Sequence, residues 1–209
     1  MSAALNSEFA FGVEAQLVNT SAAIAMSSTF FIAIHYLPHR FLPPEIDYAY
    51  TMDLTTCLWF NGCAREAANF YASIFPNSSV QDNWIAPTDT PGNKQGEEII
   101  VNFTIFGRPF IGLNGGPQFP HSEAISFQIP CAYQDEIDKY WEVLIADGGE
   151  ESQCGWLKDK FGVSWQVIAP EMGQYLGGPD VEGSQRATQA MLGMKKIDLA
   201  VMKKAYEGN

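Results

Sequence analysis

Residues 55–76, TTCLWFNGCAREAANFYASIFP, pass from a strand pattern to a helix pattern within one turn. The first six residues are rich in β-branched and aromatic side chains, and Asn61-Gly62 then favours a turn. An apolar stripe follows at i, i+3, i+4, i+7 and i+8, formed by Ala67, Phe70, Tyr71, Ile74 and Phe75. Because Pro76 cannot continue a helix, the stretch predicts a strand followed by one short amphipathic helix.

Three further strands are predicted after this helix. Residues 79–85 and 98–106 are predicted strands on either side of a loop that is rich in proline and glycine, residues 86–96. A tight turn at Gly107-Arg108 leads into a last strand, residues 110–113. The order of elements is βαβββ.

The same order returns in the second half of the chain. A strand at residues 124–129 precedes a helix whose stripe is Ile137, Tyr140, Trp141, Leu144 and Ile145. Short strands are predicted at residues 150–153, 155–158 and 163–169. We therefore predict an α+β fold with two βαβββ modules.

The predicted domain spans residues 53–178, with module one at 53–117 and module two at 122–171. Each helix covers one face of its own sheet, so the other face needs a partner or lines a cavity. The expected result is a pair of curved sheets around a cup-shaped cavity of a size that suits a small molecule.

Both ends of the chain lie outside the two modules. Residues 1–52 lack clear periodicity and are predicted to be an extension with little order, and one hypothesis places the start of translation at Met52. Residues 179–209 are predicted to form helices that pack on the sheets or on a dimer partner.

Composition excludes several classes of protein. A chain of 209 residues with 46% hydrophobic residues can bury a core, and a net charge of −12 disfavours nucleic acid as a partner. The apolar stretch at residues 22–37 is interrupted by polar side chains and is shorter than the ~20 residues of a membrane helix. The four cysteines form no C-x-x-C pair, which favours reduced thiols. We expect a cytoplasmic protein with no membrane partner.

Three segments together carry a resemblance to a known family. They are LWFNGCAREAANFYASIFPNS at residues 58–78, FIGLNGGPQF at 110–119 and CGWLKDKFGVSWQV at 154–167. They resemble the PhnB-like, or 3-demethylubiquinone-9 3-methyltransferase-like, branch of the glyoxalase, bleomycin resistance and dioxygenase (vicinal oxygen chelate) superfamily. The resemblance covers residues 55–208.

The resemblance implies a paired βαβββ fold, a homodimer and a cavity in which many relatives hold a divalent metal. The four matching ligand positions are Thr56, Asn114, Ala124 and Gln166. None carries the imidazole or carboxylate that such metals usually need, so no cofactor is predicted, although a divalent metal at unusual ligands stays possible. His121 and Glu123, which alternate just before a predicted strand, are the weak candidates for metal binding or acid–base chemistry.

Six residues are predicted to contact a ligand. Gln166 lies in an otherwise apolar strand, where a ligand, the backbone or a cross-strand partner would satisfy its amide. Asn114, beside Gly115-Gly116, is a turn residue or a cavity residue. The complete set is Thr56, Trp59, Phe103, Asn114, Trp156 and Gln166.

Three functions remain open at this point. The first is a protein that binds, and in one version transforms, a small apolar or aromatic metabolite without a standard metal centre. The second is a metal-dependent lyase, isomerase or oxygenase with unusual ligands, and the third is a resistance protein that sequesters a toxic compound. Methyl transfer is not predicted, because no helix follows the glycine-rich LNGGPQ segment to bind a methyl donor.

Overall fold

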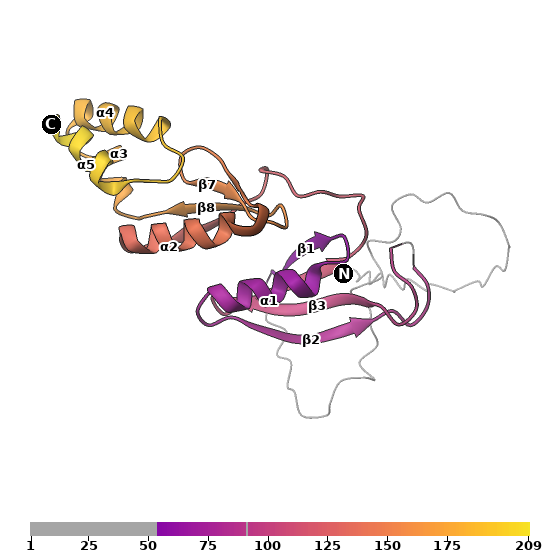
Figure 1. The fold of residues 1–209 in the computed structure, drawn as a ribbon. Helices are drawn as coiled ribbons and strands as arrows, with labels where there is room; N and C mark the ends of the chain where they lie inside the picture. The colour runs from indigo at the N-terminus through magenta and orange to yellow at the C-terminus, as the bar shows by residue number, and fades with distance from the viewer. Residues whose placement is uncertain (1–53, 91) are drawn as a thin grey trace, which may run out of the picture. The chain divides into compact units, whose positions relative to one another are not determined.

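The computed structural model describes residues 54–90 and 92–209, all of which lie within the unit Met52–Asn209 (Figure 1). The predicted extension at residues 1–52 lies outside the described residues. Within them the elements follow the predicted order, and the α+β fold with two βαβββ modules and C-terminal helices is confirmed.

Module one contains one helix and a four-stranded sheet, called sheet A. Its elements are β1 (Thr56–Phe60), α1 (Ala64–Ile74), β2 (Ser79–Ile85), β3 (Glu98–Ile105) and β4 (Arg108–Asn114). The strand order is β1-β4-β3-β2, with β1 parallel to β4 and the other pairs antiparallel. Gly112 of β4 allows α1 to lie close to the sheet, because a Cβ there would be 3.0 Å from the Cβ of Ala64.

Module two repeats this topology in sheet B. Its elements are β5 (Phe127–Pro130), α2 (Gln134–Ile145), a 3₁₀ turn (Ala146–Gly148), β6 (Glu150–Glu151), β7 (Trp156–Lys158) and β8 (Ser164–Ile168). The order is β5-β8-β7-β6, with β5 parallel to β8. The strand predicted at residues 124–129 begins only at Phe127, where pairing with Trp165 starts, so Ala124 lies in a turn rather than in the sheet.

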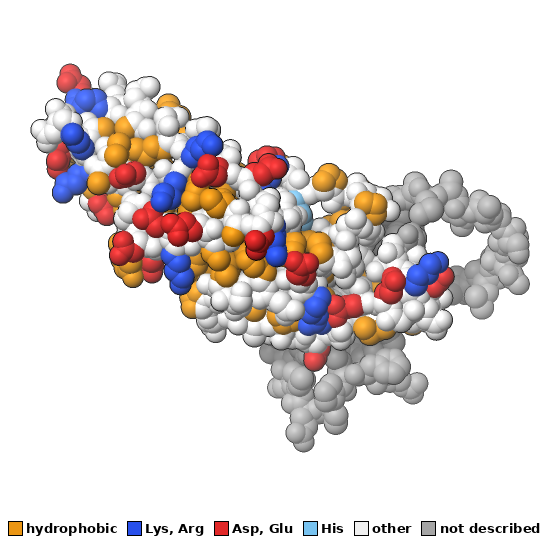
Figure 2. Space-filling view, in the orientation of Figure 1, with side chains coloured by type: hydrophobic (Ala, Val, Ile, Leu, Met, Phe, Trp, Pro, Cys, Tyr) orange, Lys and Arg blue, Asp and Glu red, His pale blue; other side chains and the backbone are white. Residues whose placement is uncertain are grey.

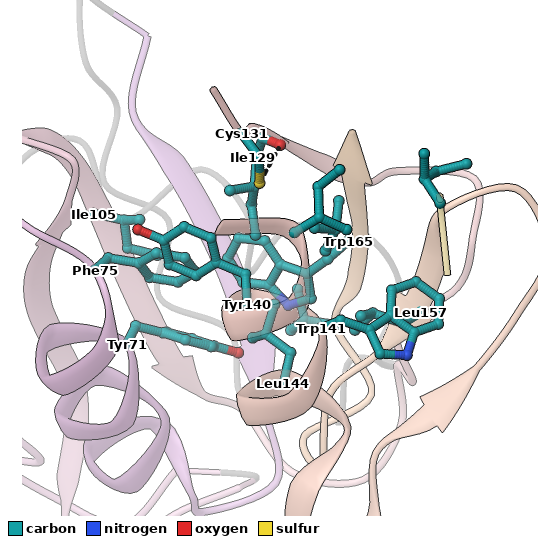
Figure 3. Packing of buried hydrophobic residues seen from close by; sticks show 14 of the residues in the cluster. Tyr71, Phe75, Ile105, Ile129, Cys131, Tyr140, Trp141, Leu144, Leu157 and Trp165 are labelled. Atoms are coloured by element: carbon teal, nitrogen blue, oxygen red, sulfur yellow. Dashed lines mark hydrogen bonds between the residues drawn. The ribbon is translucent and has the colours of Figure 1, made fainter. Parts of the chain in front are cut away.

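One hydrophobic core joins the two modules through their helix-covered faces. Tyr71 of α1 and Phe75, the residue that follows α1, pack against Trp165 of β8, with ring centroids 5.5 and 5.2 Å apart, and Phe75 also stacks on Tyr140 of α2 (Figure 3). These residues belong to a single cluster of buried side chains. The opposite face of each sheet, called its free face, is therefore on the side away from the shared core, and a cavity lined by both free faces remains a prediction.

The chain after β8 forms three helices, α3 (Met172–Leu176), α4 (Val181–Leu192) and α5 (Leu199–Glu207). They are attached to module two through Gln134, whose side-chain amide donates to the carbonyl of Ile197 and accepts from the amide of Leu199. Ile197 itself is fully buried. The C-terminal helices thus pack on the body of their own chain.

Charged groups of both signs lie next to one another on the surface (Figure 2). In the part of the chain that the structure describes, none of the helices combines the length and the apolar character of a transmembrane span.

Candidate functional site

The free face of sheet A carries a continuous apolar row across all four strands. Cα pairing aligns Trp84 of β2 with Ile100 of β3, Ile100 with Leu113 of β4, and Leu113 with Trp59 of β1. Trp84 is 38% exposed, and the other three are partly buried. Two indoles therefore flank two aliphatic side chains on a sheet face that its own helix does not cover.

Trp59 is held in place by the segment after β4, residues 115–119, called the strap. Its indole Nε1 donates to the carbonyl of Gly116 at 2.7 Å, and the ring of Phe119 meets it edge-on at 4.9 Å. The amide of Gly115 donates to the carbonyl of Phe60, which fixes the strap to the end of β1. The predicted ligand residue Trp59 thus lies on the free face with a fixed ring orientation.

The free face of sheet B has a different character. Pairing aligns Trp156 of β7 with Gln166 of β8, and Gln166 with Gln128 of β5. Gln128 Nε2 donates to Gln166 Oε1 at 3.1 Å, and Gln166 Nε2 donates to Ser126 Oγ at 2.7 Å. Of the partners considered for the Gln166 amide, the structure therefore shows cross-strand and neighbouring side chains, and Trp156 lies beside it.

Three predicted ligand residues, Thr56, Phe103 and Asn114, lie on the helix-covered face of sheet A. Phe103 is 1% exposed on the helix-covered face, where it stacks between Tyr71 and Phe110, so it belongs to the core rather than to a free face. Thr56 pairs with Phe110 and shares the parity of the buried Leu58 and Phe60, which also places it on the helix-covered side. Which face a strand residue occupies depends on the pairing register between strands, and the residue types alone do not give that register.

Asn114 has a structural role that the sequence analysis did not predict. It is 5% exposed; its Oδ1 accepts from the amide of Ala64, and its Nδ2 donates to the carbonyl of Glu98, both at 2.9 Å. Cys63, the residue before α1, makes no side-chain capping bond, so Asn114 supplies from β4 the acceptor that the helix start needs.

The four positions that the family resemblance offers as metal ligands do not form a centre. Thr56 and Asn114 lie on the helix-covered side of sheet A, Gln166 lies on the free face of sheet B, and Ala124 lies in a turn. Their side chains are hydroxyl, amide and methyl groups, which are poor ligands for the divalent metals of this superfamily. The residues present do not fit that metal centre, and we derive no chemistry through one.

Glu123 and His121 are also not joined in one site. They lie in the linker before β5 rather than on a strand, so the expected alternation does not apply. The carboxylate of Glu123 pairs with Lys158 at 2.7 Å. Across residues 54–90 and 92–209 the structure shows no group of three or more His, Cys, Asp or Glu side chains that could hold a metal ion.

His121 packs against Phe60, and its burial leads us to expect a stability that depends on pH. Its ring meets Phe60 edge-on at 5.3 Å, and its buried Nε2 has no hydrogen-bond partner among the described residues. Burial lowers the pKa of His121, although Asp159 opposes the shift.

The lowered pKa of His121 predicts that the protein loses stability in acid. Because the unfolded chain takes up a proton at a higher pH than the folded protein, we expect stability to be lost as pH falls from about 6.5, the pKa of an unperturbed His, through the lower folded pKa. Urea unfolding of wild type and His121→Phe between pH 7.5 and pH 5 checks this, since only the wild type should show the loss. Equal pH dependence of the two proteins would contradict it.

Sequence reasoning missed Asp159, which is the most highly connected buried polar residue. It is 2% exposed, and its Oδ2 accepts from Tyr71 Oη at 2.7 Å and from Trp165 Nε1 at 2.9 Å. Its Oδ1 accepts from the amides of Phe161 and Val163. The carboxylate therefore joins α1 of module one to β8 of module two. The turn signal at residues 159–162 could indicate a polar turn residue, but not its burial.

Comparison with known proteins identifies the family of this chain. Residues 52–168 match the 3-demethylubiquinone-9 3-methyltransferase family. The chain belongs to this family. The PhnB protein from Bacillus cereus shares 32% identity, covering 56% of this chain and 98% of that chain, with a TM-score of 0.50. The protein PA1353 from Pseudomonas aeruginosa is 18% identical over 56% of this chain and 96% of its own, with a TM-score of 0.45. No match was found among curated proteins.

The match confirms the PhnB-like resemblance of the three sequence segments. The family name describes a methyl transfer reaction, whereas neither free face presents a helix start or a glycine-rich loop followed by a helix in the described residues. The site is therefore described by its side chains and not by that name.

Proposed function

We propose that this protein binds a small apolar or aromatic molecule in a cavity that the free faces of two copies complete. The observation that carries the proposal is the apolar row of sheet A, Trp59, Leu113, Ile100 and Trp84. A sheet with one apolar face open to water is normally covered by another layer, and aromatic side chains offer large contact areas to flat ligands.

A second copy is the covering layer in this proposal. The hollow beside the free face of sheet B has a volume of about 120 Å³, smaller than the roughly 300–1,000 Å³ of most ligand pockets. Strands β1 and β5 are edge strands with one side unpaired within the described sheets, and such edges favour association with another chain. A homodimer would both protect these edges and enlarge the hollow.

Binding rather than turnover is the function we favour. The acid–base candidates already have partners, because Glu123 pairs with Lys158 at the hollow beside sheet B, and His121 packs on Phe60.

We also propose a cytoplasmic location for the protein. The four cysteines are free thiols, and free thiols are usual in a reducing compartment.

Substitution of Leu113 by Gln tests this function. The neutral ring compound 2-naphthol should bind the wild-type dimer, and Leu113→Gln should weaken binding about tenfold, because a buried Leu contributes about 1.5–3 kcal/mol. Isothermal titration calorimetry measures the affinity, and analytical ultracentrifugation measures the oligomeric state. Val201→Gln, on the exposed side of α5, is the matched control and should bind like the wild type. A monomeric wild type, or equal affinity of both variants, would refute the proposal.

A further inference from the structure

The free face of sheet B carries polar groups whose hydrogen-bonding capacity is only partly used. Each glutamine amide offers two N–H donors and an oxygen with two lone pairs. The chain from Gln128 through Gln166 to Ser126 uses one N–H of each amide and one lone pair of Gln166 Oε1. The second N–H of each amide and the oxygen of Gln128 remain available on the free face.

The same chain of hydrogen bonds fixes the orientation of the Gln166 amide. Its oxygen and its nitrogen are both held, by Gln128 and Ser126 respectively. A donor and an acceptor that are already oriented lose little freedom on binding a ligand, so they select for ligand geometry. The sheet pairing places the indole of Trp156 next to this amide.

A second observation points to a ligand at this face. Ser164 lies two residues before Gln166, on the same side of β8 by alternation. It is 1% exposed, and its Oγ has no hydrogen-bond partner among the residues that the structure describes. A buried hydroxyl is normally paired, so an additional polar group is expected on this side of the sheet.

The charged side chains around the hollow beside this face limit the charge of the ligand. The hollow has a volume of about 120 Å³, and Trp156 joins it to Gln166, its pairing partner, whereas Gln128, Gln166 and Ser164 do not line it. Its lining is Glu123, Glu150, Glu151, Ser152, Trp156, Leu157 and Lys158, three carboxylates against one lysine. Lys158 is paired with Glu123, and Glu151, also in the lining, accepts from Trp141 and Lys195. With a net charge of −12 on the chain, an anionic ligand is disfavoured.

We infer that the polar half of the proposed cavity recognises a neutral ring that carries an adjacent hydrogen-bond donor and acceptor, the arrangement of a lactam. A glutamine amide pairs with such an edge through two hydrogen bonds, as it does with the edge of adenine. Trp156 would stack on the ring while Gln166 and Gln128 read its edge. This inference rests on the proposed cavity and names the class of ligand for it.

Two matched probes test the inference, 2-quinolinone and N-methyl-2-quinolinone, which differ in the N–H donor of the lactam. Isothermal titration calorimetry on the full-length protein should show that 2-quinolinone binds about tenfold more tightly, the ratio expected for one hydrogen bond in a buried site. In Gln166→Leu, and in Gln128→Leu, where the residue is exposed and folding is not at risk, this preference should fall to near one. Gln185→Leu, on α4, is the matched control and should keep the preference.

Each outcome of the test decides a separate point. Equal binding of the two probes to the wild type, or a preference that persists in both Gln166→Leu and Gln128→Leu, overturns the lactam inference and leaves the proposed cavity standing. If neither probe binds the wild type although 2-naphthol does, the lactam inference alone is overturned. If 2-naphthol does not bind either, the proposed cavity is overturned as well.

Discussion

Replacement of Asp159 by Ala is expected to lower the free energy of unfolding by about 3 kcal/mol or more, since each buried donor left unpaired costs about 1–3 kcal/mol. The substitution leaves Tyr71 Oη, Trp165 Nε1 and the amides of Phe161 and Val163 without their acceptor. For a domain of this size the melting temperature should fall by about 10 °C. Chemical denaturation and thermal melts followed by circular dichroism measure the change.

Two milder substitutions separate the parts of this network. Tyr71→Phe removes only the hydrogen bond between the modules and should cost about 1.5–3 kcal/mol, the usual range for a bond to a charged group. Asp159→Asn should lower the free energy of unfolding by more than Tyr71→Phe and by less than Asp159→Ala, because the amide N–H₂ would face the N–H of Trp165. Asp82→Ala, at an exposed position of β2, is the matched control and should change stability by less than about 0.5 kcal/mol.

The pH dependence gives an independent check on Asp159. Burial raises its pKa, and the hydrogen bonds from Trp165 and Tyr71 oppose that shift. The folded state therefore holds the proton more tightly than the unfolded chain, so this contribution is fully present below the unfolded pKa and is lost as pH rises through the folded pKa. The stability difference between wild type and Asp159→Asn should shrink as pH rises through that window. A difference that grows with pH would show that the hydrogen bonds to Asp159 outweigh its burial. An Asp159→Ala protein as stable as the wild type would show that the carboxylate does not join the modules.

The elements of both modules could be predicted because each helix buries one continuous stripe. In α1 the buried Ala67 and Tyr71 belong to the predicted stripe, and in α2 the buried Ile137 and Leu144 do so. Local spacing alone sets such a stripe, whichever surface later covers it. The order of strands and helices followed from these stripes and from the turn residues between them.

The face of each strand residue could not be predicted with the same success. Phe103 and Trp59 are both aromatic residues in predicted strands of module one, yet Phe103 lies in the core and Trp59 on the free face. Which parity faces the helix depends on the pairing register, a property of two strands together. Asp159 shows the same limit, because its partner Tyr71 lies 88 residues away in the sequence.

The structure shows why residue 115, in the glycine-rich LNGGPQ segment, has to be glycine. A Cβ at Gly115 would lie 2.2 Å from Cζ2 and 2.3 Å from Cη2 of Trp59, distances that real Cβ atoms do not reach. Either the indole or the strap would have to move. Movement of either breaks the 2.7 Å bond from Trp59 Nε1 to the carbonyl of Gly116.

Gly115→Ala should therefore destabilise the protein by about 2–3 kcal/mol, the upper range for overpacking a filled site. Gly173→Ala is the matched control: an added Cβ there meets no atom within 4 Å, and alanine in a helix is favoured over glycine by up to about 1 kcal/mol. Since the added Cβ clashes with the indole of Trp59, Trp59→Leu should lower the free energy of unfolding by less in the Gly115→Ala protein than in the wild type. A double-mutant cycle from urea unfolding gives this coupling energy. Additive effects of the two substitutions would mean that Trp59 does not lie under the strap, and the apolar row of sheet A would then lose the residue that ends it.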